Sequence, residues 1–358
     1  MDETLALNAI PQPTPAAPSP SAPIPAADNA TDGRATSRVL GDSARSAVVT
    51  AGQFGAMMLP FANRTTGAAR INASLKTFAK PGTWFAPMWA MIVGCVASGN
   101  AHWQFGSVGR VLVGMILAGP LLCAFSQVTN DWFDRDVDRI NEPDRPTAAN
   151  ALAPSTVLAI SLGLAAAALG LAYALGIVVF YLALGGLALA LAYSAPPLRL
   201  KARNGWLANA ACAFAYEGFA WIAGAAIFHH VTAGTVVLAT LYSLGSHGLM
   251  TLNDFKSYEG DKRLGLRSLP VMLGLDGALR AAFAFIDIFQ VAAIAFVFAH
   301  RMYLAGAIVT LLFIIQLPMQ RKLATDPKGL APWYCASAIP PFVWGMLVCA
   351  LAVSAGGF

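Results

Sequence analysis

The chain has 358 residues, of which 57% are hydrophobic and only 11% are charged, and its mean hydropathy is +0.60. This composition excludes an ordinary soluble domain and predicts a protein that crosses a membrane several times. The net charge of +5 could indicate a nucleic-acid partner, but the basic residues lie where membrane topology requires them. We therefore expect a lipid bilayer, and no nucleic acid, as a partner.

The N-terminal region differs from the rest of the chain. Seven prolines fall between Pro11 and Pro25 among Ala and Ser, and such a sequence cannot bury enough apolar surface to offset its ordering entropy. We predict a disordered tail over 1–48 and a linker over 49–81. Apolar and basic residues follow helical spacing from Arg70 to Lys80, which predicts a short helix on the membrane surface at the end of the linker.

Nine stretches are each close to the roughly 20 apolar residues that cross a bilayer, and they fill a predicted transmembrane domain over 82–355. They are 82–100, 108–130, 154–174, 176–194, 206–228, 232–252, 278–299, 302–320 and 332–354. The third and fourth are separated by little more than Gly176. Twenty-one of the 23 basic residues lie before the first span or in and beside the loops that follow even-numbered spans. The positive-inside rule places these loops and the N-terminus in the cytoplasm.

An acidic motif begins where the second span ends. Asn130, Asp131, Asp134 and Asp138 occupy its positions 0, 1, 4 and 8, so continued helical rotation would bring the three carboxylates within about 60° of one another. Asp136 would point to the opposite face. Carboxylates gathered beside a bilayer repel one another unless a cation lies between them, and hard oxygen ligands select Mg²⁺ or Ca²⁺. The simpler alternative is a solvated loop.

A second acidic motif, Asn253 to Asp261, begins in the same way where the sixth span ends. Asp254 and Asp261 are seven residues apart and share a helix face, whereas Glu259 points away. Both motifs lie on the side predicted to be cytoplasmic. Two facing carboxylate clusters at one membrane edge could hold two Mg²⁺ ions with a diphosphate between them.

Basic residues near the same edge could complete a diphosphate site. Arg145 follows the first acidic motif, and Lys201 and Arg203 follow the fourth span. Lys and Arg both neutralise phosphate oxygens, and Arg does so with bidentate geometry. Each of the three could equally be a positive-inside anchor.

Several polar residues in or at the ends of the predicted spans are candidates for a substrate pocket. His247 lies seven residues before Asp254 and hence on the same helix face, although a packed, satisfied histidine is an equal alternative. Glu217 is an ionisable residue in the middle of the fifth span, where such a residue is a candidate for function. Tyr193 and Asn253 stand at the ends of their spans. The five cysteines are isolated and are expected to be buried thiols.

Taken together, these motifs resemble the UbiA-type intramembrane prenyltransferases. The resemblance rests on Asn-Asp-x-x-Asp-x-x-x-Asp, the basic loop and the second Asp motif, and it covers about residues 75–355. It implies an all-α fold of about nine transmembrane helices in a bundle around a central cavity. Stretches 140–146, 193–201 and 253–270 are similar to the chlorophyll and bacteriochlorophyll synthases of this superfamily, as is Ser257, where many members carry Asp. Glu217 and the residues after it resemble the bacteriochlorophyll type.

The resemblance implies an enzyme that uses Mg²⁺, with two ions bridging a geranylgeranyl or phytyl diphosphate. The acceptor would be the propionate of a chlorophyllide or bacteriochlorophyllide. It also implies a bacterial inner or intracytoplasmic photosynthetic membrane, and contacts with other proteins of pigment biosynthesis. The residues expected to act are Asn130, Asp131, Asp134 and Asp138 for one ion, Asp254 and Asp261 for the other, and Arg145, Lys201 and Arg203 for phosphate oxygens.

Other interpretations stay open. The same fold could transfer the prenyl group to an aromatic quinone precursor or to protohaem. A membrane transporter or a pigment-binding protein would also carry charged residues inside spans, but a transporter site is expected near the midplane, whereas both acidic motifs lie at one edge. A membrane phosphotransferase would place its acidic residues in one motif, and this chain has two.

Overall fold

The structure is a computed structural model that describes residues 80–358 apart from 103, 142–144 and 150–151. Over these residues the chain is helical and has no β-strand, which confirms the predicted all-α class. The proposed tail over 1–48, and the proposed linker and surface helix up to residue 79, lie outside the described residues.

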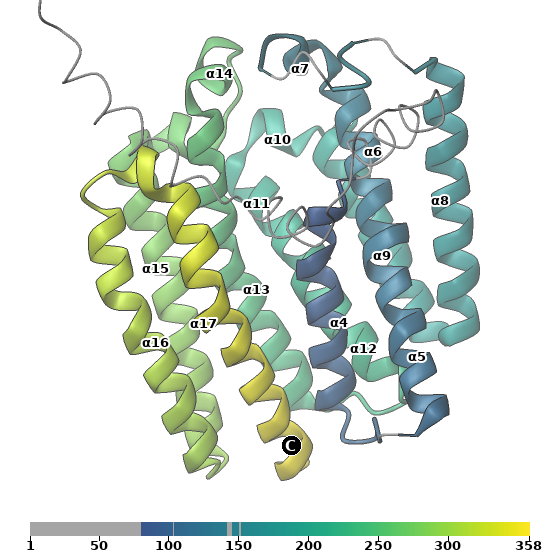
Figure 1. The fold of residues 1–358 in the computed structure, drawn as a ribbon, viewed down its shortest axis with the longest axis vertical. Helices are drawn as coiled ribbons and strands as arrows, with labels where there is room; N and C mark the ends of the chain where they lie inside the picture. The colour runs from purple at the N-terminus through teal and green to yellow at the C-terminus, as the bar shows by residue number, and fades with distance from the viewer. Residues whose placement is uncertain (1–79, 103, 142–144, 150–151) are drawn as a thin grey trace, which may run out of the picture. The chain divides into compact units, whose positions relative to one another are not determined.

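The described helices follow the predicted spans in order (Figure 1). Some spans consist of several pieces, because a π-helical or 3₁₀ turn (labelled η) interrupts the α-helix. In chain order the pieces are η1 (Pro81–Trp84), α4 (Phe85–Ala97), α5 (Phe105–Ile116), η2 (Leu117–Cys123), α6 (Ala124–Phe133), α7 (Arg135–Asn141), α8 (Pro154–Leu175), α9 (Ile177–Ser194), α10 (Leu200–Arg203), α11 (Gly205–Ala213), η3 (Phe214–Gly218), α12 (Phe219–Ile227), α13 (Ala233–Asn253), η4 (Asp254–Ser257), α14 (Tyr258–Arg263), α15 (Leu269–Ala299), α16 (Tyr303–Leu323) and α17 (Pro327–Gly356).

Eight helices in the described part of the chain are long and apolar enough to cross a membrane. The first predicted span is the shorter apolar helix Pro81–Ala97. The helix Ala233–Arg263 has 31 residues, which is more than the roughly 20 needed to cross a bilayer. Its last turns therefore carry the second acidic motif out of the most apolar zone.

Glycine and proline set two of the helix boundaries. Gly176, at φ 139°, separates α8 from α9, which confirms the predicted boundary. α15 begins at Leu269, earlier than the predicted 278, because Pro270 occupies its first turn and Gly274, at φ 72°, joins that turn to the rest of the helix. Positive φ values of this kind suit Gly. Hydropathy alone did not predict the part of α15 that precedes residue 278.

The central helices approach closely where small residues meet. A Cβ atom added to Gly94 of α4 or to Gly224 of α12 would collide with the backbone of the other helix, so these glycines bring the two helices together. Trp221 of α12 and Tyr242 of α13 lie in the largest buried apolar cluster of the described residues. By contrast, only 17% of the apolar window of α8 and 28% of that of α9 is buried inside the bundle, as expected of helices that face lipid.

The short helices beside the candidate site residues lie at one end of the bundle. Figure 1 shows α7, α10 and α14 at this end. α7 continues the first acidic motif, α10 carries Lys201 and Arg203, and α14 ends the second acidic motif. The helix order thus brings three segments that are far apart in sequence to the same edge.

Candidate functional site

The first acidic motif lies at the junction of α6 and α7. Asp134 leaves the α-helical region (φ −96°, ψ 2°), but the backbone N–H of Asp138 still donates to the carbonyl of Asp134 at 2.8 Å, so helical rotation nearly continues. Asp131, Asp134 and Asp138 are buried, with exposures of 0%, 2% and 5%. Asp136 is exposed and pairs with Arg139. The prediction that the three carboxylates share one face, with Asp136 on the opposite one, is confirmed.

Each buried carboxylate of this motif has a basic partner. The pairs are Lys80 with Asp131 at 2.5 Å, Arg145 with Asp138 at 2.7 Å and with Asp131 at 3.4 Å, Lys201 with Asp134 at 2.5 Å, and Arg199 with Asp134 at 3.6 Å. Asn130 donates from Nδ2 to Asp134 Oδ2 at 2.8 Å. The four basic residues balance the negative charge of the buried carboxylates. Burying each carboxylate without a counter-ion would cost several kcal/mol.

Lys201 links the first acidic motif to the second. Its ammonium group bonds Asp134 and lies within electrostatic range of Asp261 and Asp138. Burial alone would lower the pKa of Lys201, but the charge and hydrogen bond of Asp134, together with the other two carboxylates, outweigh burial and raise that pKa. Lys201 is therefore held as a cation between the two motifs.

The second acidic motif is shaped by the 3₁₀ turn η4. Asp254 accepts a hydrogen bond from Asn209 Nδ2 at 3.2 Å, and Asp261, which is 5% exposed, accepts one from Ser257 Oγ at 3.0 Å. Glu259 is exposed and pairs with Lys328, so the prediction that it points away is confirmed. Tyr193, at the end of α9, lies within electrostatic range of Asp134, Asp254 and Asp261. The two motifs therefore share Tyr193 and Lys201 as common neighbours.

Other candidates lie outside this group. Arg203 is exposed at the end of α10 and has no ion pair with a described carboxylate, and Asn253 is also exposed. The His247 ring stacks with Trp206 and Phe285 at centroid distances of 5.7 and 4.3 Å, and its Nε2 contacts the Trp206 carbonyl at 3.1 Å. The ring is therefore packed between aromatic neighbours, but its buried Nδ1 has no hydrogen-bond partner among the described residues. Glu217 is buried in η3, in the middle of its span.

Two basic residues of the site, Lys80 and Arg199, were not singled out by the sequence. Both adopt the left-handed backbone conformation, with φ 48° and 39°, and such values are uncommon for residues other than glycine. Backbone strain of this kind concentrates at functional sites. The sequence shows only that each basic residue stands close to a proline, at Pro81 or Pro197, which indicates a turn but not the carboxylate that the side chain reaches.

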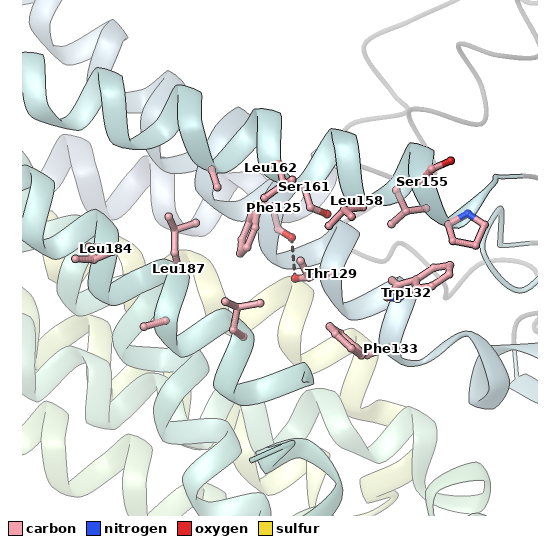
Figure 2. A pocket seen from close by; sticks show the side chains of 15 residues that line it. Phe125, Thr129, Trp132, Phe133, Ser155, Leu158, Ser161, Leu162, Leu184 and Leu187 are labelled. Carbon is pink, nitrogen blue, oxygen red and sulfur yellow. Dashed lines mark hydrogen bonds between the residues drawn. The ribbon is translucent and has the colours of Figure 1, made fainter. Parts of the chain in front are cut away.

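A separate apolar pocket of about 640 Å³ lies between α6, α8 and α9 (Figure 2). Its lining includes Phe125, Thr129 and Phe133 from α6, and the Thr129 hydroxyl is held by the Phe125 carbonyl at 2.8 Å. Helical periodicity puts Thr129 and Phe133 on the side of α6 opposite Asp131. Asp131 of the first acidic motif therefore does not face this pocket, whose lining includes the exposed Leu158.

The donor set of the site suits a hard cation, although the carboxylates are paired with basic residues. Among the described residues, no three His, Cys, Asp or Glu side chains are grouped closely enough to hold a metal ion. Asp131 Oδ2 is nevertheless buried with no hydrogen-bond partner in the described part of the chain. Burial raises the pKa of the Asp138 carboxyl, and Arg145 offsets this only in part. Both carboxyls could therefore accept a further positive charge.

These features can be compared with known proteins. The UbiA prenyltransferase family matches residues 86–344, which run from α4 to α17 and include both acidic motifs. The chain belongs to the UbiA prenyltransferase family. The family assignment confirms the resemblance that the Asp motifs indicated, and the matched region includes α10 with Lys201.

Relatives that are similar to this chain include synthases of bacteriochlorophyll and chlorophyll. It is 44% identical over 277 residues to the bacteriochlorophyll synthase 34 kDa chain of Chloroflexus aurantiacus, which covers 77% of this chain and 88% of that one. It is 43% identical to a chloroplastic chlorophyll synthase of Oryza sativa, over 77% of this chain and 75% of the relative. A UbiA homologue from Archaeoglobus fulgidus, solved with GPP and Mg²⁺, shares the fold at TM-score 0.59 and 19% identity, over 76% of this chain and 99% of that chain.

Proposed function

We propose that this UbiA-family protein is a bacteriochlorophyll or chlorophyll synthase. It would transfer a geranylgeranyl or phytyl group from its diphosphate to the propionate of a bacteriochlorophyllide or chlorophyllide. The observation that carries the proposal is the meeting of the two acidic motifs with the basic loop around Lys201 at one end of the bundle. The choice of acceptor is supported by the 44% and 43% identity to synthases of these two pigments.

The residues at this end fit a diphosphate and Mg²⁺ together. Asn130, Asp131, Asp134 and Asp138 would hold one ion and Asp254 and Asp261 a second, and the unpartnered Oδ2 of Asp131 supports the fit. Bound Mg²⁺ would neutralise charge that develops on the departing diphosphate. Lys80, Arg145, Arg199 and Lys201 would then exchange carboxylate partners for phosphate oxygens, because both are anionic oxygen acceptors.

The acceptor chemistry suits a site without an obvious general base. In the proposed reaction a propionate oxygen forms a bond to C1 of the prenyl group, and the bond from C1 to the diphosphate oxygen breaks with its electron pair. A propionate is ionised at neutral pH, so no proton has to be removed. Transfer to an aromatic carbon would instead require loss of a ring proton. The surrounding helices would exclude water from the reacting carbon.

The deciding experiment offers the detergent-purified full-length protein geranylgeranyl diphosphate and Mg²⁺ with three acceptors in parallel. These are bacteriochlorophyllide a, chlorophyllide a and 4-hydroxybenzoate. Asp134→Ala, which removes a buried carboxylate, is compared with Asp136→Ala, which removes an exposed one from the same motif. We expect a Mg²⁺-dependent chlorin ester from the wild type and from Asp136→Ala, with at least about a 100-fold loss in Asp134→Ala.

The outcomes separate the alternatives. Turnover of 4-hydroxybenzoate alone would keep the family and reject the chlorin acceptor. A chlorin ester that forms equally well with EDTA, or in Asp134→Ala, would reject the metal site proposed here. Folded protein that yields no product from any acceptor would favour a transporter or a pigment-binding protein.

A further inference from the structure

A buried carboxyl group in the middle of the bundle has no role in the site described above. Glu217 lies in the π-helical turn η3 between α11 and α12, and it is only 7% exposed. Its Oε2 has no hydrogen-bond partner within the described residues. Leaving such a group unpaired is costly, and π-helical turns are frequent at functional sites. These two properties indicate that Glu217 serves a ligand.

The neighbour of Glu217 on α13 follows from the register of the two antiparallel segments. Three contacts fix that register: Asn209 Nδ2 to Asp254 Oδ2 at 3.2 Å, Cys212 Sγ to Met250 Sδ at 3.5 Å, and the rings of Trp221 and Tyr242 at 5.7 Å. Glu217 precedes Trp221 by one turn, and Ser246 follows Tyr242 by one turn. In this register Glu217 and Ser246 lie at the same level of the bundle.

Two further polar atoms near this level also lack partners. Trp221 Nε1 and Ser246 Oγ are buried, their residues are 0% and 1% exposed, and neither atom has a hydrogen-bond partner in the part of the chain that the structure describes. An indole N–H can only donate, a serine hydroxyl can donate, and a carboxyl group donates in its protonated form, which is the form favoured for a buried acid that has no ion-pair partner among the described residues. The three residues therefore suit a ligand that offers an oxygen acceptor and is otherwise apolar, since Trp221 and Tyr242 belong to the largest buried apolar cluster.

We propose that Glu217, Trp221 and Ser246 bind a carbonyl oxygen on the rim of the tetrapyrrole acceptor, an inference that rests on the function proposed above. Glu217 lies eight residues from Asn209, or about 12 Å along the helix from the second acidic motif. An acceptor whose propionate reaches the diphosphate would extend inward over this depth. Its ring carbonyls would then meet the polar group on facing turns of η3, α12 and α13.

A purely structural role would have a different signature, which another acid inside a predicted span shows. Asp287 of α15 is bonded to Gln320 of α16 by a short side-chain hydrogen bond, so it joins two helices. Glu217 makes no comparable bond to a described neighbour. Asp287→Asn is therefore the matched control for substitutions at Glu217, because both acids lie inside predicted spans.

The test uses the full-length protein in detergent with bound bacteriochlorophyllide a. Resonance Raman spectra report the carbonyl stretching bands, which move to lower frequency when the oxygen accepts a hydrogen bond. We expect a lowered band in the wild type and in Asp287→Asn, and its return toward the free frequency in Glu217→Leu, Trp221→Phe and Ser246→Ala. The KM for the chlorin should rise about tenfold, as for one lost buried hydrogen bond, while the KM for the prenyl diphosphate stays unchanged. Glu217→Gln should restore part of the band shift and part of the affinity for the chlorin, because the Gln amide can donate a hydrogen bond.

A matched pair of acceptors identifies the oxygen. 3-Acetyl chlorophyllide a differs from chlorophyllide a only by an acetyl group in place of vinyl. If the variants raise the KM for the acetyl compound alone, the bound oxygen is that of the acetyl group. An equal rise in KM with both compounds assigns the ring ketone. The proposal is overturned if the bands and the KM of all three variants match the wild type in folded protein. A wild type that binds neither chlorin would overturn the proposed function itself.

Discussion

The distance of a basic side chain from the buried carboxylates, together with its burial, predicts how strongly it would bind phosphate. Lys201 contacts Asp134 and lies near Asp261, whereas Arg203, which the sequence singled out equally, is exposed. We expect Lys201→Ala to lower kcat/KM for the prenyl diphosphate by at least about 100-fold, because it removes a preorganised cation that is bonded to a buried carboxylate. Arg203→Ala should change it less than about threefold, because water and salt screen an exposed charge. Steady-state kinetics at fixed chlorin measures both.

That comparison also bears on the sequence-based prediction. If Arg203 binds phosphate as the sequence suggested, Arg203→Ala would lose as much activity as Lys201→Ala. Arg199 provides a third point, since it lies 3.6 Å from Asp134. An intermediate loss in Arg199→Ala would support the ranking by distance and burial.

Lys80 is the closest counter-ion of a fully buried carboxylate, Asp131. Lys80→Ala leaves Asp131 with Arg145 at 3.4 Å as its remaining ion-pair partner among the described residues. We expect a loss of about 2 kcal/mol in stability, below the cost of breaking a fully buried pair because Lys80 is part-exposed. Added Mg²⁺ should recover part of the loss if Asp131 is a metal ligand. Thermal unfolding with and without Mg²⁺ measures both effects.

The matched control is Lys328→Ala, which removes an exposed ion pair with Glu259 on the same side. Its stability should stay within about 0.5 kcal/mol of the wild type. A Mg²⁺ response in Lys80→Ala no larger than in Lys328→Ala would argue against Asp131 as a ligand.

The contact between α4 and α12 depends on two glycines. Gly94→Ala would put a Cβ atom into the backbone of α12 at Trp221, so the helices would have to separate. We expect a loss of about 1–3 kcal/mol, with lower activity because α12 also carries Trp221. Gly163→Ala is the control in α8, where an added Cβ meets nothing within 4 Å; it should be neutral or slightly stabilising. Equal melting temperatures for the two variants would contradict this account.

Helix identity was predictable from the sequence, and helix interruptions were not. Apolar length placed the spans, and Gly176 marked the break between α8 and α9. The π-helical turns η2 and η3 could not be predicted, because each lies inside an apolar stretch whose composition also suits a continuous α-helix. The turn η3 gives Glu217 its position, so its alignment with Ser246 required the structure.

The candidate site was predictable to the extent that its residues were close in sequence. The spacing of Asp131, Asp134 and Asp138 placed them on one face. Lys80 and Arg199 reach the same carboxylates from distant segments through left-handed turns, and no local pattern encodes such a contact. The pairing of every buried carboxylate of the first motif with a cation is thus a property of the tertiary fold.

The charge distribution predicts the orientation of the bundle in the membrane. Basic residues gather at the end that carries both acidic motifs, and the positive-inside rule predicts that this end faces the cytoplasm. In a variant without the five native cysteines, Glu259→Cys marks this end and Arg301→Cys marks the opposite loop between α15 and α16; both positions are exposed. We expect a membrane-impermeant maleimide to label Arg301→Cys in intact bacterial cells, and Glu259→Cys only after permeabilisation. The reverse pattern would put the diphosphate site outside the cell, away from the cytoplasmic supply of prenyl diphosphates, and would contradict the topology on which the proposed reaction depends.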